Sequence, residues 1–261
     1  MALYLYCVRE KSSVPFSIKG IGGSERVFTI AYKDLDAVVS VVSPRAFSGE
    51  DIEKKAQSDI LWIAEKARIH EAILEEAMGS DKRQPVIPLK FGTIFSRRVD
   101  LLNSLSLHYD RFSSTLKKLE GKQEWHCKVF LQDARALERN IRLSSKVIRE
   151  KEKEMQAMNE GAAYFASIEV ATRIKQEKDK TLAGLRESIF QTLNRHAETA
   201  THGKILAKEL TGISESMILN GFFLLRKEKI SEFQKTMERL IKKFPTLHFV
   251  FRGPWPPYNF V

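Results

Sequence analysis

The chain has 261 residues, enough for one large domain or two of ordinary size, and its apolar share of 43% is normal for a globular protein. No stretch approaches the roughly 18 uninterrupted apolar residues of a membrane helix, and the opening MALYLYCVREK lacks the basic segment of a secretion signal. We therefore expect a cytoplasmic protein without a membrane segment. The net charge of +10 permits an anionic partner, although a solvated helix face explains it more simply.

The first 121 residues predict an α/β domain. Three runs have the alternation or β-branched content of strands, and two longer segments have the apolar spacing of amphipathic helices. These segments are residues 2–8, 27–32 and 37–42 for the strands, and 52–77 and 102–119 for the helices. A start signal at 48–51 and Gly79 should bound the first helix. Residues 85–95 are apolar but contain Pro88 and Gly92, which predicts an irregular buried segment or an edge strand.

Residues 122–253 predict a second domain with the order strand, long helix, strand, strand, helix, strand. The segments are 125–131, 133–200, 202–210, 216–225, 230–241 and 247–251. This βαββαβ order is that of a ferredoxin-like unit, here with an extended helical insertion at 133–200. The predicted fold class is therefore α+β, with two α/β domains. Because strands 125–131 and 216–225 are the most apolar, they should be neighbours at the centre of the sheet.

The helical insertion combines two kinds of sequence. Residues 133–160 mix acidic and basic side chains, which is typical of a solvated or coiled-coil-like helix, and Gly161 is a candidate break. Residues 162–199 then place apolar side chains on one helical stripe. The members of this stripe are Phe165, Ile168, Leu182, Leu185, Ile189 and Leu193.

Two features are candidate partner-binding surfaces. The strand at 216–225 is apolar on both faces, so the side chains of Ile218, Phe222 and Leu224 need cover beyond a single layer of helices. The tail at 254–261 has three prolines and cannot form a helix or a central strand, yet it carries Trp255, Tyr258 and Phe260. These aromatic side chains either cap the core of their own molecule or contact a partner.

The sequence offers no enzyme chemistry. It contains no HExxH, CxxC, phosphate-loop or GxSxG motif, so we expect no catalytic, cofactor-binding or metal-ligating residues. His196 and His202 are six apart across a predicted helix end and more simply form surface or capping contacts. Cys7 and Cys127 lie in strand-like runs, where a thiol is usually a small buried apolar group.

Four motifs resemble one family. LYLYCV at 3–8, PLKFGTIF at 88–95, MILNGFFLL at 217–225 and the terminal GPWPPYNFV occur in the order found in the GvpF/GvpL gas vesicle proteins. The resemblance implies an accessory protein of gas vesicle assembly, associated with gas vesicles in the cytoplasm. Its implied partners are the hydrophobic shell protein, which it would bind during nucleation or growth as minor component or chaperone, and other gas vesicle accessory proteins.

The alternative is an RNA-binding protein. Ferredoxin-like sheets bind RNA through aromatic side chains on their strands, and Phe249 and Phe251 lie on a predicted strand of a basic chain. No RNP-like run is present, however, so we do not expect nucleic acid as a partner.

Overall fold

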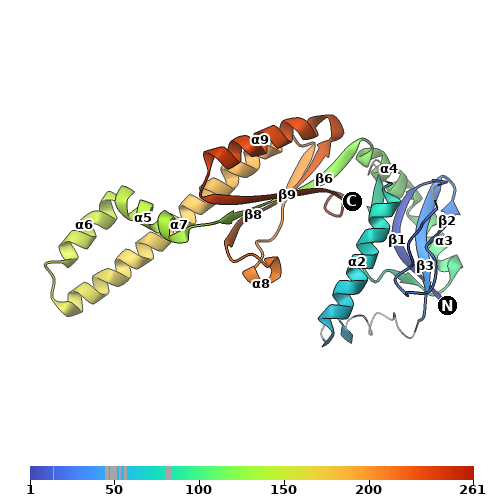
Figure 1. The fold of residues 1–261 in the computed structure, drawn as a ribbon, viewed down its shortest axis with the longest axis horizontal. Helices are drawn as coiled ribbons and strands as arrows, with labels where there is room; N and C mark the ends of the chain where they lie inside the picture. Colours follow the sequence, from blue (N-terminus) through green and yellow to red (C-terminus); the bar gives the residue numbers. More distant parts are fainter. Residues whose placement is uncertain (14, 45–46, 48–51, 53, 56–57, 80–83) are drawn as a thin grey trace. The chain divides into compact units, whose positions relative to one another are not determined.

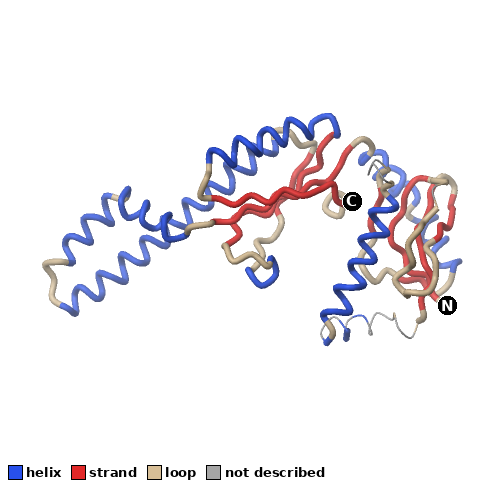
Figure 2. The backbone as a smooth tube through the Cα atoms, viewed as in Figure 1, coloured by secondary structure: helices blue, strands red, loops and turns tan. Residues whose placement is uncertain are grey.

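The computed structural model describes residues 1–261 except 14, 45–46, 48–51, 53, 56–57 and 80–83 (Figure 1). By packing, the described chain divides into two compact units. Unit 1 comprises Met1–Glu124 with Gly253–Val261, and unit 2 comprises Trp125–Arg252. The C-terminal residues thus belong to unit 1, whereas the sequence analysis set 254–261 apart as a separate tail. The expected α+β class is confirmed, because each unit combines a β-sheet with helices (Figure 2).

Unit 1 is built around strand β1. The sheet order is β2-β3-β1-β4, and β5 also pairs with β1. The strands are β1 (Ala2–Glu10), β2 (Phe28–Tyr32), β3 (Leu35–Val42), β4 (Val86–Pro88) and β5 (Ile94–Phe95). Strands β2 and β3 form the predicted hairpin. The segment predicted to be irregular becomes the edge strand β4 and the short β5, separated by a turn in which Gly92 has a φ of +86°. Pro88 is tolerated there because an edge strand leaves one side of its ladder unpaired.

Helices cover both faces of this sheet. They are α2 (Ile60–Ala77) on one face, and α3 (Arg98–Leu107) with α4 (Tyr109–Leu119) on the other. The start signal at 48–51 lies outside the described residues, and α2 begins after Asp59, whose carboxylate accepts a 3.0 Å hydrogen bond from the Trp62 amide. A bulge in β1 between Leu5 and Cys7 lets Tyr6 and Cys7, although adjacent, both pack on the α2 face.

The core beneath α2 is partly polar. The Tyr4 hydroxyl is 2.9 Å from Nδ1 of His70 and accepts a 2.9 Å hydrogen bond from the Gly92 amide. The Tyr6 hydroxyl is 2.7 Å from the Ser40 hydroxyl and accepts the Ile21 amide at 2.8 Å. Burial raises the pKa of both tyrosines and lowers the pKa of His70 to about 4. These bonds connect β1 to the turn at Gly92 and to α2.

Unit 2 has the sheet order β7-β8-β6-β9. Its strands are β6 (Lys122–Leu131), β7 (Thr199–His202), β8 (Ser216–Arg226) and β9 (Leu247–Trp255). Strands β6 and β8 are adjacent inner strands, as their apolar sequences predicted. Strand β9 runs three residues beyond Arg252, through Pro254, which its edge position allows.

The helices of unit 2 are α5 (Ala134–Ser144), α6 (Lys146–Met155), α7 (Glu160–Asn194), α8 (Lys208–Thr211) and α9 (Ile230–Lys243), with a 3-10 turn at Lys227–Lys229. Helices α7 and α9 pack on one face of the sheet, whereas α8 lies beyond the other face (Figure 1). The apolar cluster between these helices and the sheet includes Cys127, Leu219 and Phe223 of the strands, Ile189 of α7 and Phe233 of α9.

Two predictions of segments were wrong. The strand expected at 202–210 does not form over that range. The short β7 ends at His202, residues 203–207 form an irregular segment, here called the crossing, and α8 follows. A Cβ at Gly203 would collide with the Phe222 ring, so the crossing runs tightly against β8. The Gly203 amide donates to the Asn220 carbonyl at 2.7 Å, and the Asn220 amide group donates to the Lys204 carbonyl at 2.9 Å.

The helical insertion also differs from its prediction. The charged helix expected at 133–160 is two helices that meet at Ser145, and Gly161 lies inside α7, which Asn159 caps with a 2.9 Å bond to the Ala162 amide. Helices α5 and α6 pack along the first half of α7 (Figure 1). The apolar stripe of α7 is correct at Ile189 and Leu193 but wrong at Phe165 and Ile168, which are exposed. The side chains buried there are Ala166, Val170 and Ile174.

His70 should make the stability of unit 1 depend on pH. Between its ordinary pKa of 6.5 and its folded pKa of about 4, the unfolded chain binds a proton at His70 and the folded chain does not. The part of the free energy of unfolding that depends on neutral His70 is therefore fully present above pH 6.5, and it falls as the pH drops toward 4. We expect urea denaturation to give a free energy of unfolding about 2 kcal/mol lower at pH 5 than at pH 7. The His70→Gln variant should lose most of this difference, and an unchanged pH dependence would disprove the assignment.

Candidate partner-binding site

Unit 1 contains a pocket of about 450 Å³, which we call the tail pocket. Its volume is within the range of ligand sites. Its wall combines β1, the β4–β5 segment, α3, α4 and the C-terminal segment. The lining residues are Leu5, Ile87, Pro88, Leu89, Lys90, Thr93, Phe95, Leu101, Ser104, Leu105, His108, Arg111, Phe112, Thr115, Tyr258 and Val261.

Three of the motifs quoted from the sequence meet at the tail pocket. LYLYCV contributes Leu5, PLKFGTIF contributes residues from Pro88 to Phe95, and GPWPPYNFV contributes Tyr258 and Val261. Backbone hydrogen bonds hold the first two motifs together, because the Leu5 amide donates to the Thr93 carbonyl at 2.9 Å. The fourth motif, MILNGFFLL, lies in β8 of unit 2 and takes no part.

The chemistry of the tail pocket is apolar with a cationic rim. Leucine, isoleucine, proline and phenylalanine side chains provide most of the wall. Its charged side chains are Lys90 and Arg111, with His108 beside them, and no lining residue is acidic. Such a surface suits a partner segment in which an apolar side chain is flanked by carboxylates. Removal from water favours binding of the apolar side chain, and the cationic rim attracts the carboxylates.

Two carboxylates hold the C-terminal segment in place. Glu124 is 0% exposed, and its oxygens accept the Asn259 backbone amide at 3.0 Å and the Asn259 side-chain amide at 2.6 Å. The Tyr258 hydroxyl donates to Glu71 over a longer 3.4 Å. Burial of the hydroxyl, together with the Glu71 charge, raises the pKa of Tyr258. A buried carboxylate is stable only with hydrogen-bond donors, so Asn259 is a strong anchor.

The aromatic residues predicted as a binding surface have three different environments. Tyr258 is exposed and lines the tail pocket, whereas Trp255 ends β9 and Phe260 follows the last turn, both half-buried. The segment packs on its own unit and also forms a pocket wall. Whether Trp255 and Phe260 bind a partner stays a prediction.

The residues predicted on β8 belong to unit 2, and none of them lines the tail pocket. Ile218 and Leu224 are buried, and Phe222 is half-buried, with its ring 4.5 Å from that of His126. The crossing at 203–207 supplies part of the cover that this face requires, a source the sequence analysis did not consider. A role for these three side chains in partner binding stays a prediction.

Sequence reasoning missed most of the pocket wall. Of the apolar residues of α3 and α4 that line it, Leu105 and Phe112 were assigned only to the packing of the helix expected at 102–119, and Leu101 precedes that helix. The PLKFGTIF motif was the available signal, because an apolar stretch interrupted by proline and glycine often forms an irregular wall rather than a regular strand.

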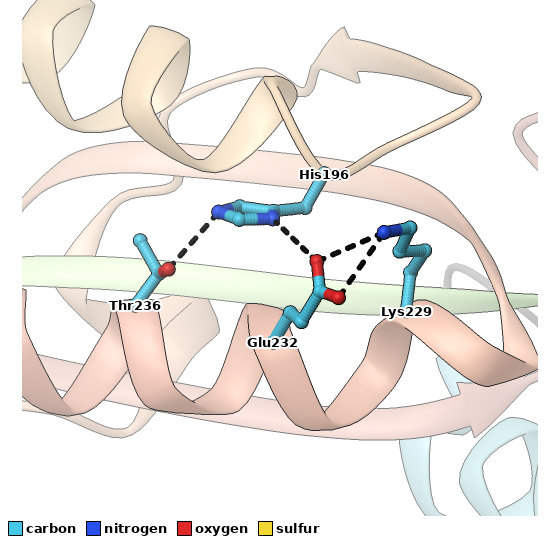
Figure 3. Close-up of polar contacts among 4 residues, drawn as sticks. All are labelled: His196, Lys229, Glu232 and Thr236. Atoms are coloured by element: carbon cyan, nitrogen blue, oxygen red, sulfur yellow. Dashed lines mark hydrogen bonds and ion pairs between the residues drawn. The ribbon is translucent and has the colours of Figure 1, made fainter.

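His196 belongs to a separate polar cluster on unit 2 (Figure 3). Its Nε2 atom is 3.0 Å from the Thr236 hydroxyl, and its Nδ1 atom is 3.8 Å from Glu232, which also pairs with Lys229 at 3.1 Å. His202 instead stacks on Phe190, with ring centroids 3.7 Å apart. The two histidines thus have different partners, and the described residues contain no group of three or more potential metal ligands.

The aromatic side chains required by the RNA-binding alternative are half-buried against the core of unit 2. Phe251 stacks between Trp125 and Phe233, at centroid distances of 4.6 and 5.2 Å. Phe249 packs against the same apolar cluster. Because Phe251 already stacks on two aromatic neighbours within its own unit, its ring offers no support for stacking on bases.

Comparison with known proteins gives the family. The model of the family described as gas vesicle synthesis protein GvpL/GvpF matches residues 2–261. The chain belongs to this family. The resemblance of the four motifs is therefore confirmed, and this GvpL/GvpF protein is involved in gas vesicle formation. Among its described residues, no helix is both long enough and apolar enough to cross a membrane.

Individual relatives are distant but extend over nearly the whole chain. Gas vesicle protein F1 of Halobacterium salinarum is 23% identical over 99% of this chain and 92% of its own length. Gas vesicle protein L of a Streptomyces species is 25% identical over 98% of this chain and 91% of its own length. The crystal structure of gas vesicle protein GvpF from Anabaena sp. PCC7120 superposes with a TM-score of 0.74 at 21% identity, covering 99% of this chain and 97% of that one. This likeness shows a shared fold.

The Asn259→Ala substitution should destabilise unit 1 by about 1.5–3 kcal/mol, because it removes a hydrogen bond to the buried Glu124 carboxylate. The measurement is the urea denaturation midpoint at neutral pH. Asn103→Ala is the matched control, since Asn103 is an exposed residue of α3. Equal midpoints for Asn259→Ala and the control would show that the anchor contributes nothing.

Proposed function

We propose that this GvpL/GvpF protein binds the hydrophobic shell subunit of the gas vesicle during nucleation or growth, and that the tail pocket is the contact site. The observation that carries the proposal is the convergence of three family-like motifs on one apolar pocket with a cationic rim. Membership of the family supports the vesicle context.

The physical problem is to keep an apolar subunit from aggregating in water. An apolar side chain in the tail pocket is removed from solvent, at roughly 1.5–3 kcal/mol for a large side chain that becomes fully buried. The excess of lysine and arginine over acidic residues, 43 against 33, opposes self-association of such a complex. The protein acts in the cytoplasm at the growing vesicle, as a chaperone or as a minor structural component.

Filling the pocket tests the proposal. Ser104 is a half-buried residue of the pocket wall on α3, so Ser104→Trp should occupy the space that a partner side chain needs. We expect affinity for the shell subunit to fall about tenfold to a hundredfold, the equivalent of one lost buried side chain. Binding is measured by co-purification and by titration of the purified subunit, and the melting temperature reports whether the variant folds.

Reversing a rim charge tests the electrostatic part. Arg111→Glu should slow association and reverse the salt dependence of binding. The reason is that a cation at the pocket rim, which would attract the carboxylates of the partner, becomes an anion that repels them. Lys118→Glu is the matched control, since Lys118 is also exposed on α4 but does not line the pocket. If both lysine and arginine variants change binding equally, net charge rather than the tail pocket governs the interaction.

Stoichiometry distinguishes a chaperone from a minor structural component. A minor structural component stays with vesicles that have been purified by flotation, at a constant ratio to the shell subunit, whereas a chaperone is lost from them. If the protein binds neither the subunit nor the vesicle, the proposed function is wrong.

A further inference from the structure

The first half of α7 carries an exposed apolar face. Phe165 is 69% exposed, Tyr164 64% and Ile168 47%, and the two aromatic rings contact each other edge to face at 5.8 Å. The opposite face of the same helix packs on α5 and α6, which buries Val170 and Ile174 (Figure 1). Three large neighbouring apolar side chains on one exposed helix face are typical of an interaction site.

The exposed face has the spacing of a helix-pairing seam. Successive members are separated by three and four residues, the repeat that keeps one side of a helix turned toward a second helix. The seam residues are Gly161, Tyr164, Ile168, Ala171 and Lys175, all of them exposed. Phe165 and Thr172 lie beside the seam on the same side.

We propose that α7 pairs antiparallel with α7 of a second copy of this chain. A two-fold axis at Ile168 would place Gly161 of one copy opposite Lys175 of the other, with Glu160 beside it. Gly161 leaves room for the lysine stem, since a Cβ there would approach only the Asn159 side chain, at 3.8 Å. The ammonium group of Lys175 then reaches the Glu160 carboxylate.

Charge complementarity selects this occupant and this direction. In an antiparallel pair, each Lys175 faces the other copy's Glu160, twice by symmetry, which makes the face self-complementary. A parallel pair would instead oppose Lys175 to Lys175 and Glu160 to Glu160. Within the part of the chain that the structure describes, neither side chain has an ion-pair partner. On one helix the two residues are about 22 Å apart, too far for contact within one copy.

The proposal concerns unit 2 only and does not depend on the function of the tail pocket. It is tested by sedimentation velocity of the full chain at physiological salt over about a hundredfold range of concentration, since a dimer dissociates on dilution. We expect a monomer–dimer equilibrium. Ile168→Asp and Phe165→Ser should each weaken dimerisation at least about tenfold, because the first removes an apolar contact within the seam and the second an apolar contact beside it.

Leu143→Asp is the matched control. Leu143 is a 70% exposed apolar residue of α5 in the same helical hairpin, but it lies outside the seam, so this variant should dimerise like the wild type. Circular dichroism and melting temperature verify that all three variants fold, which is expected because every substituted side chain is exposed.

A charge swap tests the register. Lys175→Glu alone should weaken the dimer about tenfold, and adding Glu160→Lys in the same chain should restore it, because the pairs re-form with reversed sign. A wild type that stays monomeric at every concentration overturns the proposal. Dimerisation that survives the seam substitutions, or that the double swap fails to restore, equally excludes this antiparallel register.

Discussion

The structure depends on a buried carboxylate that joins two distant parts of the chain. Glu124 is the last residue of the long N-terminal part of unit 1, and Asn259 belongs to the part that returns after unit 2. Two hydrogen bonds connect them across 135 residues of sequence. Because an unpaired buried carboxylate is strongly unfavourable, the C-terminal segment has a defined place and Tyr258 and Val261 become wall residues of the tail pocket.

The two candidate surfaces differ in chemistry and in location. The tail pocket in unit 1 is concave, apolar and rimmed by cations, and it suits a single side chain of a partner. The seam on α7 in unit 2 is a convex helix face with aromatic rings and complementary end charges. The two proposed contacts, with a shell subunit and with a second copy of the chain, therefore use different residues.

Local sequence patterns predicted much of the fold, whereas the site required long-range information. Alternating and β-branched runs identified β2, β3 and β8, since β3 and β8 are almost wholly buried and β2 buries Ile30. The stripe of α7 failed at Phe165 because periodicity shows that a helix has an apolar face but not which apolar residues meet a neighbour. The break at Ser145 has no glycine or proline to mark it. The tail pocket combines residues from Leu5 to Val261, and no local pattern encodes such a meeting.

Unit 1 is discontinuous, and this affects how the protein is made. Chains are synthesised from the N-terminus, and domains generally fold as units during synthesis. Unit 2, residues Trp125–Arg252, is complete in sequence before residues Gly253–Val261 emerge, so it can fold while unit 1 still lacks its final segment. The tail pocket gains its last wall only when those residues have left the ribosome. A nascent chain that still lacks Gly253–Val261 therefore has an unfinished pocket, which these residues complete.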